Sequence, residues 1–236
     1  MTASEARESL PRRVARLGLN ALLAWRRNSF LMRLRFEARL RGVALELAVG
    51  RNFVVGKGVR AELGGRRVRF VVGDDVTFAD QVRFHLMDAE VSVGTGCGLK
   101  RECLIHVFGG RFILDDYCGL SQRCIVHCAE EVHIASWTVV SEYTTLADSL
   151  HEVPMEPVTR NWLRDADAVE KAPIRIGSYV FVGAKATILK GVTIGDHSIV
   201  GANSLVMSDV PPRTTAIGVP ARRIPRRRPS PAPESE

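Results

Sequence analysis

A six-residue spacing of aliphatic residues constrains the fold of this chain more than any other feature. An aliphatic side chain recurs at every sixth position over one stretch, at Ile176, Val182, Ile188, Ile194, Val200 and Val206. A glycine follows four of these residues, and a small or aliphatic residue usually stands four positions after them. A helix repeats every 3.6 residues, and this period does not explain the spacing. Three six-residue sides close one triangular coil, and stacked coils hydrogen-bond as parallel strands.

The same frame extends upstream with small insertions. Its sets of three are Val72, Phe78 and Phe84; Val93, Leu99 and Ile105; Leu114, Leu120 and Val126; and Ile134, Val140 and Leu146. These sets begin 21, 21 and 20 residues apart, so each coil contains two or three additional corner residues. A weaker first set consists of Val49, Val55 and Ala61. The sequence therefore predicts a mainly β chain, a parallel β-helix of about seven coils.

The two ends of the chain differ from this body in charge. Residues 1–45 contain ten arginines and three glutamates and no hexapeptide, whereas the net charge of the whole chain is +7. We expect residues 1–45 to form one or two amphipathic helices that cap the open end of the coil. Weak contact of this basic segment with a membrane surface is the alternative. Residues 46–212 form the predicted β-helix, and residues 213–236 end in a proline-rich tail that we expect to be disordered. We expect no nucleic-acid partner.

The cysteines follow the same frame. Five cysteines occur without a Cys-x-x-Cys pair, and we find no secretory signal, so we expect reduced thiols in a cytoplasmic protein. Four of them occupy the fifth position of their hexapeptides, at Cys97, Cys103, Cys118 and Cys124. We interpret these four as stacked core residues, with a metal cluster as the alternative.

The C-terminal stretch resembles a known family. Residues 174–224 begin IRIGSYVFVGAKATILKGVTIGDHSI and end DVPPRTTAIGVPARRI. This pattern resembles the hexapeptide-repeat acyltransferases, the group that includes galactoside, maltose and serine O-acetyltransferases. The chain departs from it at Phe181, Ser208 and Val219, where Trp, Lys and Asn are common. The resemblance implies a left-handed parallel β-helix with an N-terminal helical cap, a homotrimer, and acetyl-CoA as acyl donor without a metal.

An irregular segment is the predicted active-site loop. The frame ends at Leu146 and resumes at Ile174, so residues 147–173 are the longest irregular stretch within the coil. Long loops in compact repeats are usually functional. A neutral imidazole can take the proton of an acceptor hydroxyl, and His151 is the candidate general base. Asp148 would fix the tautomer of that imidazole or contact the acceptor.

The resemblance also implies where coenzyme A binds. In this family the pantetheine arm lies along a groove between neighbouring coils, where small residues let it approach the backbone. The matching positions here are Ala184 and Ala202. Met207 and Ser208 would flank the adenine, and Arg222 and Arg223 would meet the phosphates.

Three histidines and one tryptophan are candidates for the acceptor side. His85, His106 and His127 recur 21 residues apart at one hexapeptide position, which predicts a ladder with steps of about 4.8 Å. Such a ladder could bind metal, line an acceptor groove or consist of repeated corner residues. We expect His127 and Trp162 to contact the substrate, which we interpret as a carbohydrate hydroxyl.

Two other functions remain open. A γ-class carbonic-anhydrase-like zinc protein shares the expected fold, and residues 126–129 faintly match its first ligand segment, but the paired His-x4-His segment is absent. A non-catalytic hexapeptide-repeat scaffold is the second alternative.

Overall fold

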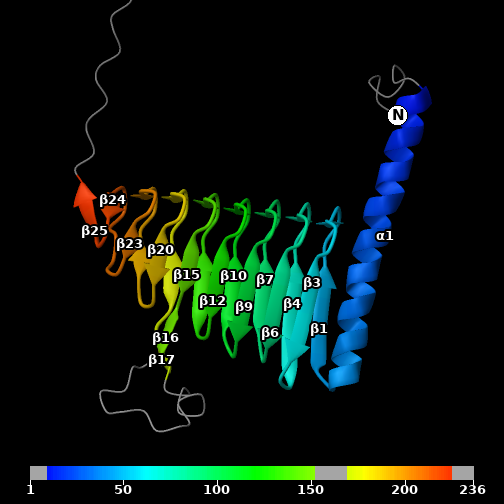
Figure 1. Ribbon diagram of the computed structural model, residues 1–236, viewed down its shortest axis with the longest axis horizontal. Coiled ribbons are helices and arrows are strands. Elements are labelled where there is room, and N and C mark those ends of the chain that lie inside the picture. Colours follow the sequence, from blue (N-terminus) through cyan, green and yellow to red (C-terminus); the bar gives the residue numbers. More distant parts are fainter. Residues whose placement is uncertain (1–9, 152–168, 225–236) are drawn as a thin grey trace, which may run out of the picture.

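The chain folds into a three-sided prism with one long helix across its N-terminal end (Figure 1). The structure, a computed structural model, describes residues 10–151 and 169–224, and the side chains of residues 18–150 and 170–224. Each side of the prism is a sheet of parallel strands, apart from the antiparallel last strand of sheet B, and sheets A, B and C follow one another around each coil.

The strands of each sheet stack in chain order. Sheet A contains β1 (Ala44–Val49), β4 (Arg67–Val72), β7 (Glu90–Val93), β10 (Arg111–Leu114), β13 (Glu131–Ile134), β18 (Ile174–Ile176) and β21 (Thr193–Ile194). Sheet B contains β2 (Val54–Val55), β5 (Thr77–Phe78), β8 (Gly98–Leu99), β11 (Gly119–Leu120), β14 (Val139–Val140), β19 (Phe181–Val182), β22 (Ile199–Val200), β24 (Thr215–Gly218) and β25 (Ala221–Ile224). Sheet C contains β3 (Arg60–Gly64), β6 (Arg83–Met87), β9 (Leu104–Phe108), β12 (Ile125–Cys128), β15 (Thr145–Ala147), β20 (Thr187–Leu189) and β23 (Leu205–Val206).

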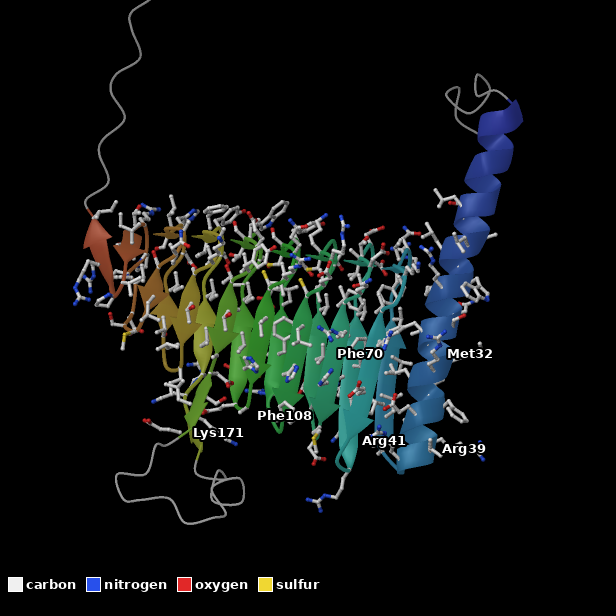
Figure 2. All side chains as sticks on the ribbon, viewed as in Figure 1. Met32, Arg39, Arg41, Phe70, Phe108 and Lys171 are labelled. Carbon is white, nitrogen blue, oxygen red and sulfur yellow. The ribbon has the colours of Figure 1, made fainter. Side chains whose placement is uncertain are left out.

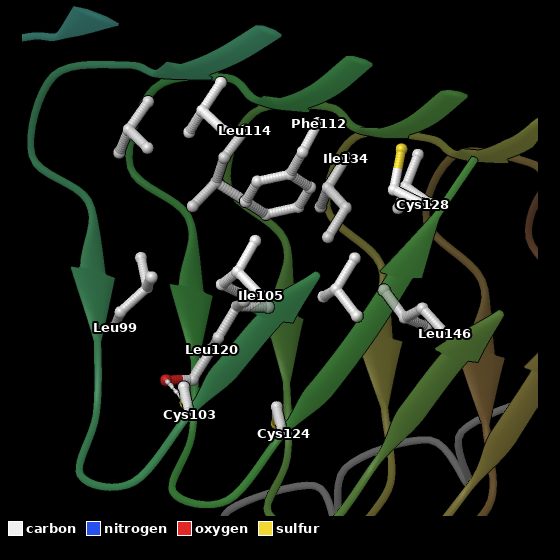
Figure 3. Packing of buried hydrophobic residues seen from close by; sticks show 14 of the residues in the cluster. Leu99, Cys103, Ile105, Phe112, Leu114, Leu120, Cys124, Cys128, Ile134 and Leu146 are labelled. Carbon is white, nitrogen blue, oxygen red and sulfur yellow. Dashed lines mark hydrogen bonds between the residues drawn. The ribbon is translucent and has the colours of Figure 1, made fainter. Parts of the chain in front are cut away.

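The aliphatic frame of the sequence is the core of the prism. Every residue of the predicted frame from Val72 to Val206 is buried, while its neighbours along each strand point outward. Figure 3 shows Leu99, Ile105 and Leu114 pointing into the space that the three sheets enclose. The predicted parallel β-helix of about seven coils is therefore confirmed.

The predicted stacking of the cysteines is confirmed as well. All five cysteines are buried and unpaired as thiols. The thiol of Cys103 donates to the carbonyl of Ser121 at 2.9 Å, and the thiol of Cys124 donates to that of Ser141 at 3.1 Å. These two thiols thus hydrogen-bond to the backbone of the next coil, whereas the thiol of Cys128 donates to the carbonyl of Arg111, 17 residues earlier. These contacts give the cysteines a packing role.

The N-terminal segment forms one helix, α1 (Leu10–Arg41), rather than two. Phe30, Leu34 and Ala38 recur every four residues and are buried against the first coil, so they face the prism together. The ring of Phe30 lies 6.5 Å from that of Phe53, and the Glu37 carboxylate accepts a hydrogen bond from the amide of Leu63. These contacts cover the open end of the core. Within the described residues, no helix is both long and apolar enough to cross a membrane.

Candidate functional site

The predicted active-site loop leaves the prism as a two-stranded ribbon. Strand β16 (Ser149–His151) pairs antiparallel with β17 (Val169–Lys171), and His151 is opposite Val169. The ribbon starts directly after β15, at the corner where sheet C leads to sheet A, and it projects away from the coils (Figure 1). The side chain of His151 and all of Trp162 lie outside the described residues. The structure therefore describes the backbone of His151, the candidate base, within the ribbon.

Asp148 attaches this ribbon to the preceding coil. Its side chain is fully buried, and its two carboxylate oxygens accept hydrogen bonds from the amides of Ala129 (2.7 Å) and Glu130 (2.8 Å). Its own amide donates to the carbonyl of His127, and its carbonyl accepts from Ala172 on the returning strand. Both oxygens thus bind backbone amides, so Asp148 positions both ends of the ribbon. Sequence reasoning assigned it to the imidazole or the acceptor and did not foresee this role.

The three histidines form the expected ladder on the outward face of sheet C. His85 is in register with His106, and His106 with His127. The first two rings stack at 4.4 Å, and the next two meet edge to face at 5.2 Å. They lie within strands, so the interpretation as corner residues is wrong. His127, the last histidine of the ladder, is in register with Ala147 on the next strand. Ala147 directly precedes Asp148, so the ladder ends close to the start of the ribbon.

The central imidazole of the ladder is held in its neutral form. Burial, followed by the charges of His85 and His127, lowers the pKa of His106 from 6.5 to about 4. Its Nε2 atom is buried and has no hydrogen-bond partner among the described residues. Within the same part of the chain, no three His, Cys, Asp or Glu side chains lie close enough together to bind a metal ion.

The two alanines of the predicted coenzyme A groove lie one above the other. Ala184 and Ala202 follow Gly183 and Gly201 in successive coils, at the corner between sheets B and C. The amide of Asn203 donates to the carbonyl of Ala184 at 2.8 Å, which joins the two coils at this corner. A Cβ atom at position 183 would lie 2.5 Å from the amide nitrogen of Ala202, so only glycine fits there. Ala184 is half-buried and Ala202 is exposed, so two small side chains face the surface at this corner.

A small pocket at the C-terminal end brings three predicted residues together. Ser208, Arg222 and Arg223 line it beside Asp209 and Ala216. Strand β25 turns back antiparallel on β24, which places Arg223 opposite Ala216. The carboxylate of Asp209 accepts a hydrogen bond from the amide of Thr193 at 2.7 Å, so one of its oxygens already has a partner. Met207 is exposed next to this pocket. Two guanidinium groups beside a hydroxyl are suited to phosphate oxygens.

Among the residues that the structure describes, these two groups of candidate residues do not meet within one chain. Asp148 and the ribbon lie at the corner between sheets C and A, whereas Ala184 and Ala202 lie at the corner between sheets B and C. The outward face of sheet C, with His127 on it, separates the two corners. A reaction between their ligands therefore requires a substrate that crosses this face or a second copy of the chain.

Sequence reasoning missed an exposed aromatic stack. The rings of Tyr117 and Trp137 stack at 4.4 Å, Tyr179 lies 6.2 Å from Trp137, and His197 lies 5.0 Å from Tyr179. All four occupy the fourth hexapeptide position at the corner between sheets A and B, and all have a positive φ. That shared position was the signal that could have revealed the stack. Next to it, Val139, Phe181 and Ile199 project outward from sheet B and are exposed.

The sequence repeat matches a known family. Residues 173–207 match the family described as bacterial transferase hexapeptide (six repeats). Residues 173–207 contain the hexapeptide repeat of bacterial transferases. This match, together with the three-sided prism, confirms the resemblance that the motif of residues 174–224 carries.

The hexapeptide-repeat chain is similar to one curated enzyme over part of its length. It is 38% identical to the galactoside O-acetyltransferase of Escherichia coli over 94 residues, which are 37% of this chain and 46% of that enzyme. The chain thus spans less than half the length of this relative.

Solved structures share its fold. One is the Ser-to-Ala mutant of AntD, an N-acyltransferase from Bacillus cereus, in complex with dTDP-4-amino-4,6-dideoxyglucose and coenzyme A. It has a TM-score of 0.56 at 17% identity and covers 78% of this chain and 85% of its own. A second mutant of AntD, with dTDP and coenzyme A, has a TM-score of 0.53 at 18% identity and covers 81% of this chain and 88% of its own. These likenesses confirm the left-handed parallel β-helix.

Proposed function

We propose that this chain is an acyltransferase that moves an acetyl group from acetyl-CoA to a hydroxyl of a carbohydrate or glycan-type acceptor. One observation supports this more than any other: the pocket that Ser208, Arg222 and Arg223 line at the end of a hexapeptide-repeat coil. Two exposed arginines there suit the phosphates of coenzyme A, and the small corner at Ala184 and Ala202 suits its pantetheine arm. The partial likeness to a galactoside O-acetyltransferase favours the same donor and a sugar hydroxyl.

In this proposal His151 is the general base. Its neutral imidazole removes the proton of the acceptor hydroxyl while the oxygen attacks the thioester carbonyl. The new C–O bond forms and the C–S bond breaks. The imidazolium returns its proton to the departing sulfur, which leaves as the thiol of coenzyme A. Asp148 positions the ribbon that bears His151, and His127 at the end of the histidine ladder would contact the acceptor. Contact of Trp162 with the acceptor also stays a prediction.

We also propose a homotrimer. The exposed apolar side chains of sheet B, Val139, Phe181 and Ile199, lie beside the aromatic stack, and apolar surface of this kind favours contact between copies. A neighbouring copy would also bring its own corner residues to the ribbon of the first, since one chain keeps them apart. The cytoplasmic location and the division at residues 45 and 212 stay predictions.

A release assay for the thiol of free coenzyme A tests the function. Purified chain is mixed with acetyl-CoA and a panel of sugar, amino-sugar and amino-acid acceptors, and products are identified by mass. The wild type should release thiol only with an acceptor, and His151→Ala should lose at least about 99% of the rate, since general bases contribute 10²–10⁴-fold. His133→Ala is the matched control, because His133 pairs with Asp115 on sheet A.

The outcomes separate the proposals. Equal turnover by wild type and His151→Ala would contradict the assigned base. Transfer to amino groups alone would keep the enzyme class and replace the hydroxyl acceptor. No transfer and no binding of acetyl-CoA would favour the scaffold. No specific observation favours the zinc enzyme, because the described residues contain no metal-binding group.

A further inference from the structure

Helix α1 has a second apolar face that points away from the prism. Met32, Phe36 and Leu40 are exposed over 62%, 68% and 73% of their surface. Large apolar side chains at such exposure are uncommon as a group, and here they follow one another along a single helix. Figure 2 shows Met32 on the side of α1 that faces away from the coils.

The spacing makes these residues one stripe. Each residue of an α-helix advances about 100°, so positions 32, 36 and 40 point in nearly the same direction. The docked residues Phe30, Leu34 and Ala38 point about half a turn away from them. The core of the prism therefore accounts for one apolar face of α1 and leaves the opposite face uncovered by any described residue.

Arginines flank this outer stripe. Residues 10–41 contain nine arginines and one glutamate. Among the arginines whose side chains are described, Arg41 alone forms an ion pair with a described residue, and its partner Glu37 is the one acid of the helix. On the helical wheel Arg26 and Arg33 border one side of the stripe, and Arg35 and Arg39 border the other. The outer face thus combines apolar side chains with uncompensated positive charge.

We propose that the outer face of α1 lies in the headgroup region of an anionic lipid bilayer. An apolar stripe flanked by arginines is the pattern of a helix that lies in a membrane interface. The apolar side chains would enter the acyl boundary while the guanidinium groups remain at the phosphates. Two such helices would repel each other through their arginines, which favours a lipid surface over a second copy of α1.

The geometry of the chain is compatible with this placement. Two residues separate the end of α1 from the start of β1, and α1 covers one end of the prism (Figure 1). The helix can therefore lie flat on a surface while the coils extend away from it. The ribbon and the pocket of Arg222 and Arg223 would then stay in water. This inference does not depend on the proposed function.

A vesicle flotation assay with the full-length chain tests the proposal. One set of vesicles contains equal parts phosphatidylglycerol and phosphatidylcholine, and the other contains phosphatidylcholine alone. The wild type should partition into the anionic set at least about tenfold more strongly, and binding should weaken as salt rises. Met32→Ser/Phe36→Ser should lower partitioning about tenfold or more, because two apolar side chains that would be buried in the bilayer are lost.

A matched pair of substitutions controls for general loss of apolar surface. Met87 and Phe108 are exposed, in register on β6 and β9, and far from α1 in sequence. Met87→Ser/Phe108→Ser should bind vesicles as the wild type does, and thermal melting should show that both variants are folded. The proposal is overturned if wild type shows no preference for anionic vesicles, or if both double variants bind alike. It is also overturned if the wild type stays unbound and Met32→Ser/Phe36→Ser changes the oligomer mass, because a second copy then covers the stripe.

Discussion

Replacement of Asp148 by asparagine should loosen the ribbon from the coil. The buried carboxylate accepts two amides, one on each oxygen. Asparagine keeps one acceptor oxygen and directs an NH₂ group at the other amide, so one charge-assisted hydrogen bond is lost and a buried donor is left unpaired. Such a bond contributes about 1.5–3 kcal/mol. We therefore expect a loss of about 2–3 kcal/mol, or a fall in Tm of about 4–12 °C for a domain of this size.

Two measurements check this expectation. Thermal melting gives Tm, and amide hydrogen exchange should show faster exchange at Ala129 and Glu130 in Asp148→Asn. Asp196→Asn is the control, because Asp196 accepts a single amide, from Ser178, with one oxygen near the surface. Unchanged exchange at Ala129 and Glu130, with a Tm equal to that of the wild type, would refute the role assigned to Asp148.

Three further predictions concern the histidine ladder, the phosphate pocket and the outward face of sheet B. The pKa of His106 is lowered from 6.5 to about 4 in the folded chain, so the unfolded chain binds the proton first as pH falls. The contribution of neutral His106 to stability is therefore full above pH 6.5 and is lost towards pH 4. Because the ring is partly exposed, we expect the free energy of unfolding, measured by urea titration, to fall by about 1–2 kcal/mol over this pH range. The fall should be smaller in His106→Gln. Arg223→Gln should weaken acetyl-CoA binding about tenfold or more in calorimetry, while Arg213→Gln leaves it unchanged; equal affinity in all three proteins would remove the phosphate assignment. Phe181→Arg should convert an assembly of three 26.0 kDa chains to monomers in light scattering, and a wild type that is itself monomeric would contradict the trimer.

The coil could be predicted because one residue type at one position determines it. Val72, Leu99 and Val206 belong to different sheets and different coils, yet each is buried because it occupies the first hexapeptide position. The hydrophobic effect acts on each coil in the same way, so a local pattern repeated many times was sufficient to predict the prism.

The site could be predicted only in part, because its geometry depends on contacts between coils. Nothing in the sequence around Asp148 indicates that its carboxylate binds amides 18 and 19 residues earlier. The outer stripe of α1 was hidden for a related reason. Periodicity shows which residues of a helix are apolar, but it does not show which of two apolar faces the prism covers.

The aromatic stack shows the remaining limit. Tyr117, Trp137 and Tyr179 have positive φ angles, which favour glycine or asparagine over aromatic residues. Backbone hydrogen bonds between coils, such as that from the amide of Tyr117 to the carbonyl of Thr95, impose this conformation. Local propensity therefore gives no indication of these corners, whereas their common hexapeptide position does.

The central claim is that this hexapeptide-repeat chain binds acetyl-CoA and uses His151 to transfer the acetyl group. A direct test compares wild type and His151→Ala in one experiment that measures both the Kd for acetyl-CoA and kcat with the best acceptor. The account predicts an unchanged Kd and a kcat at least about 100-fold lower in the variant. An unchanged kcat, or a wild type that does not bind acetyl-CoA, would contradict it.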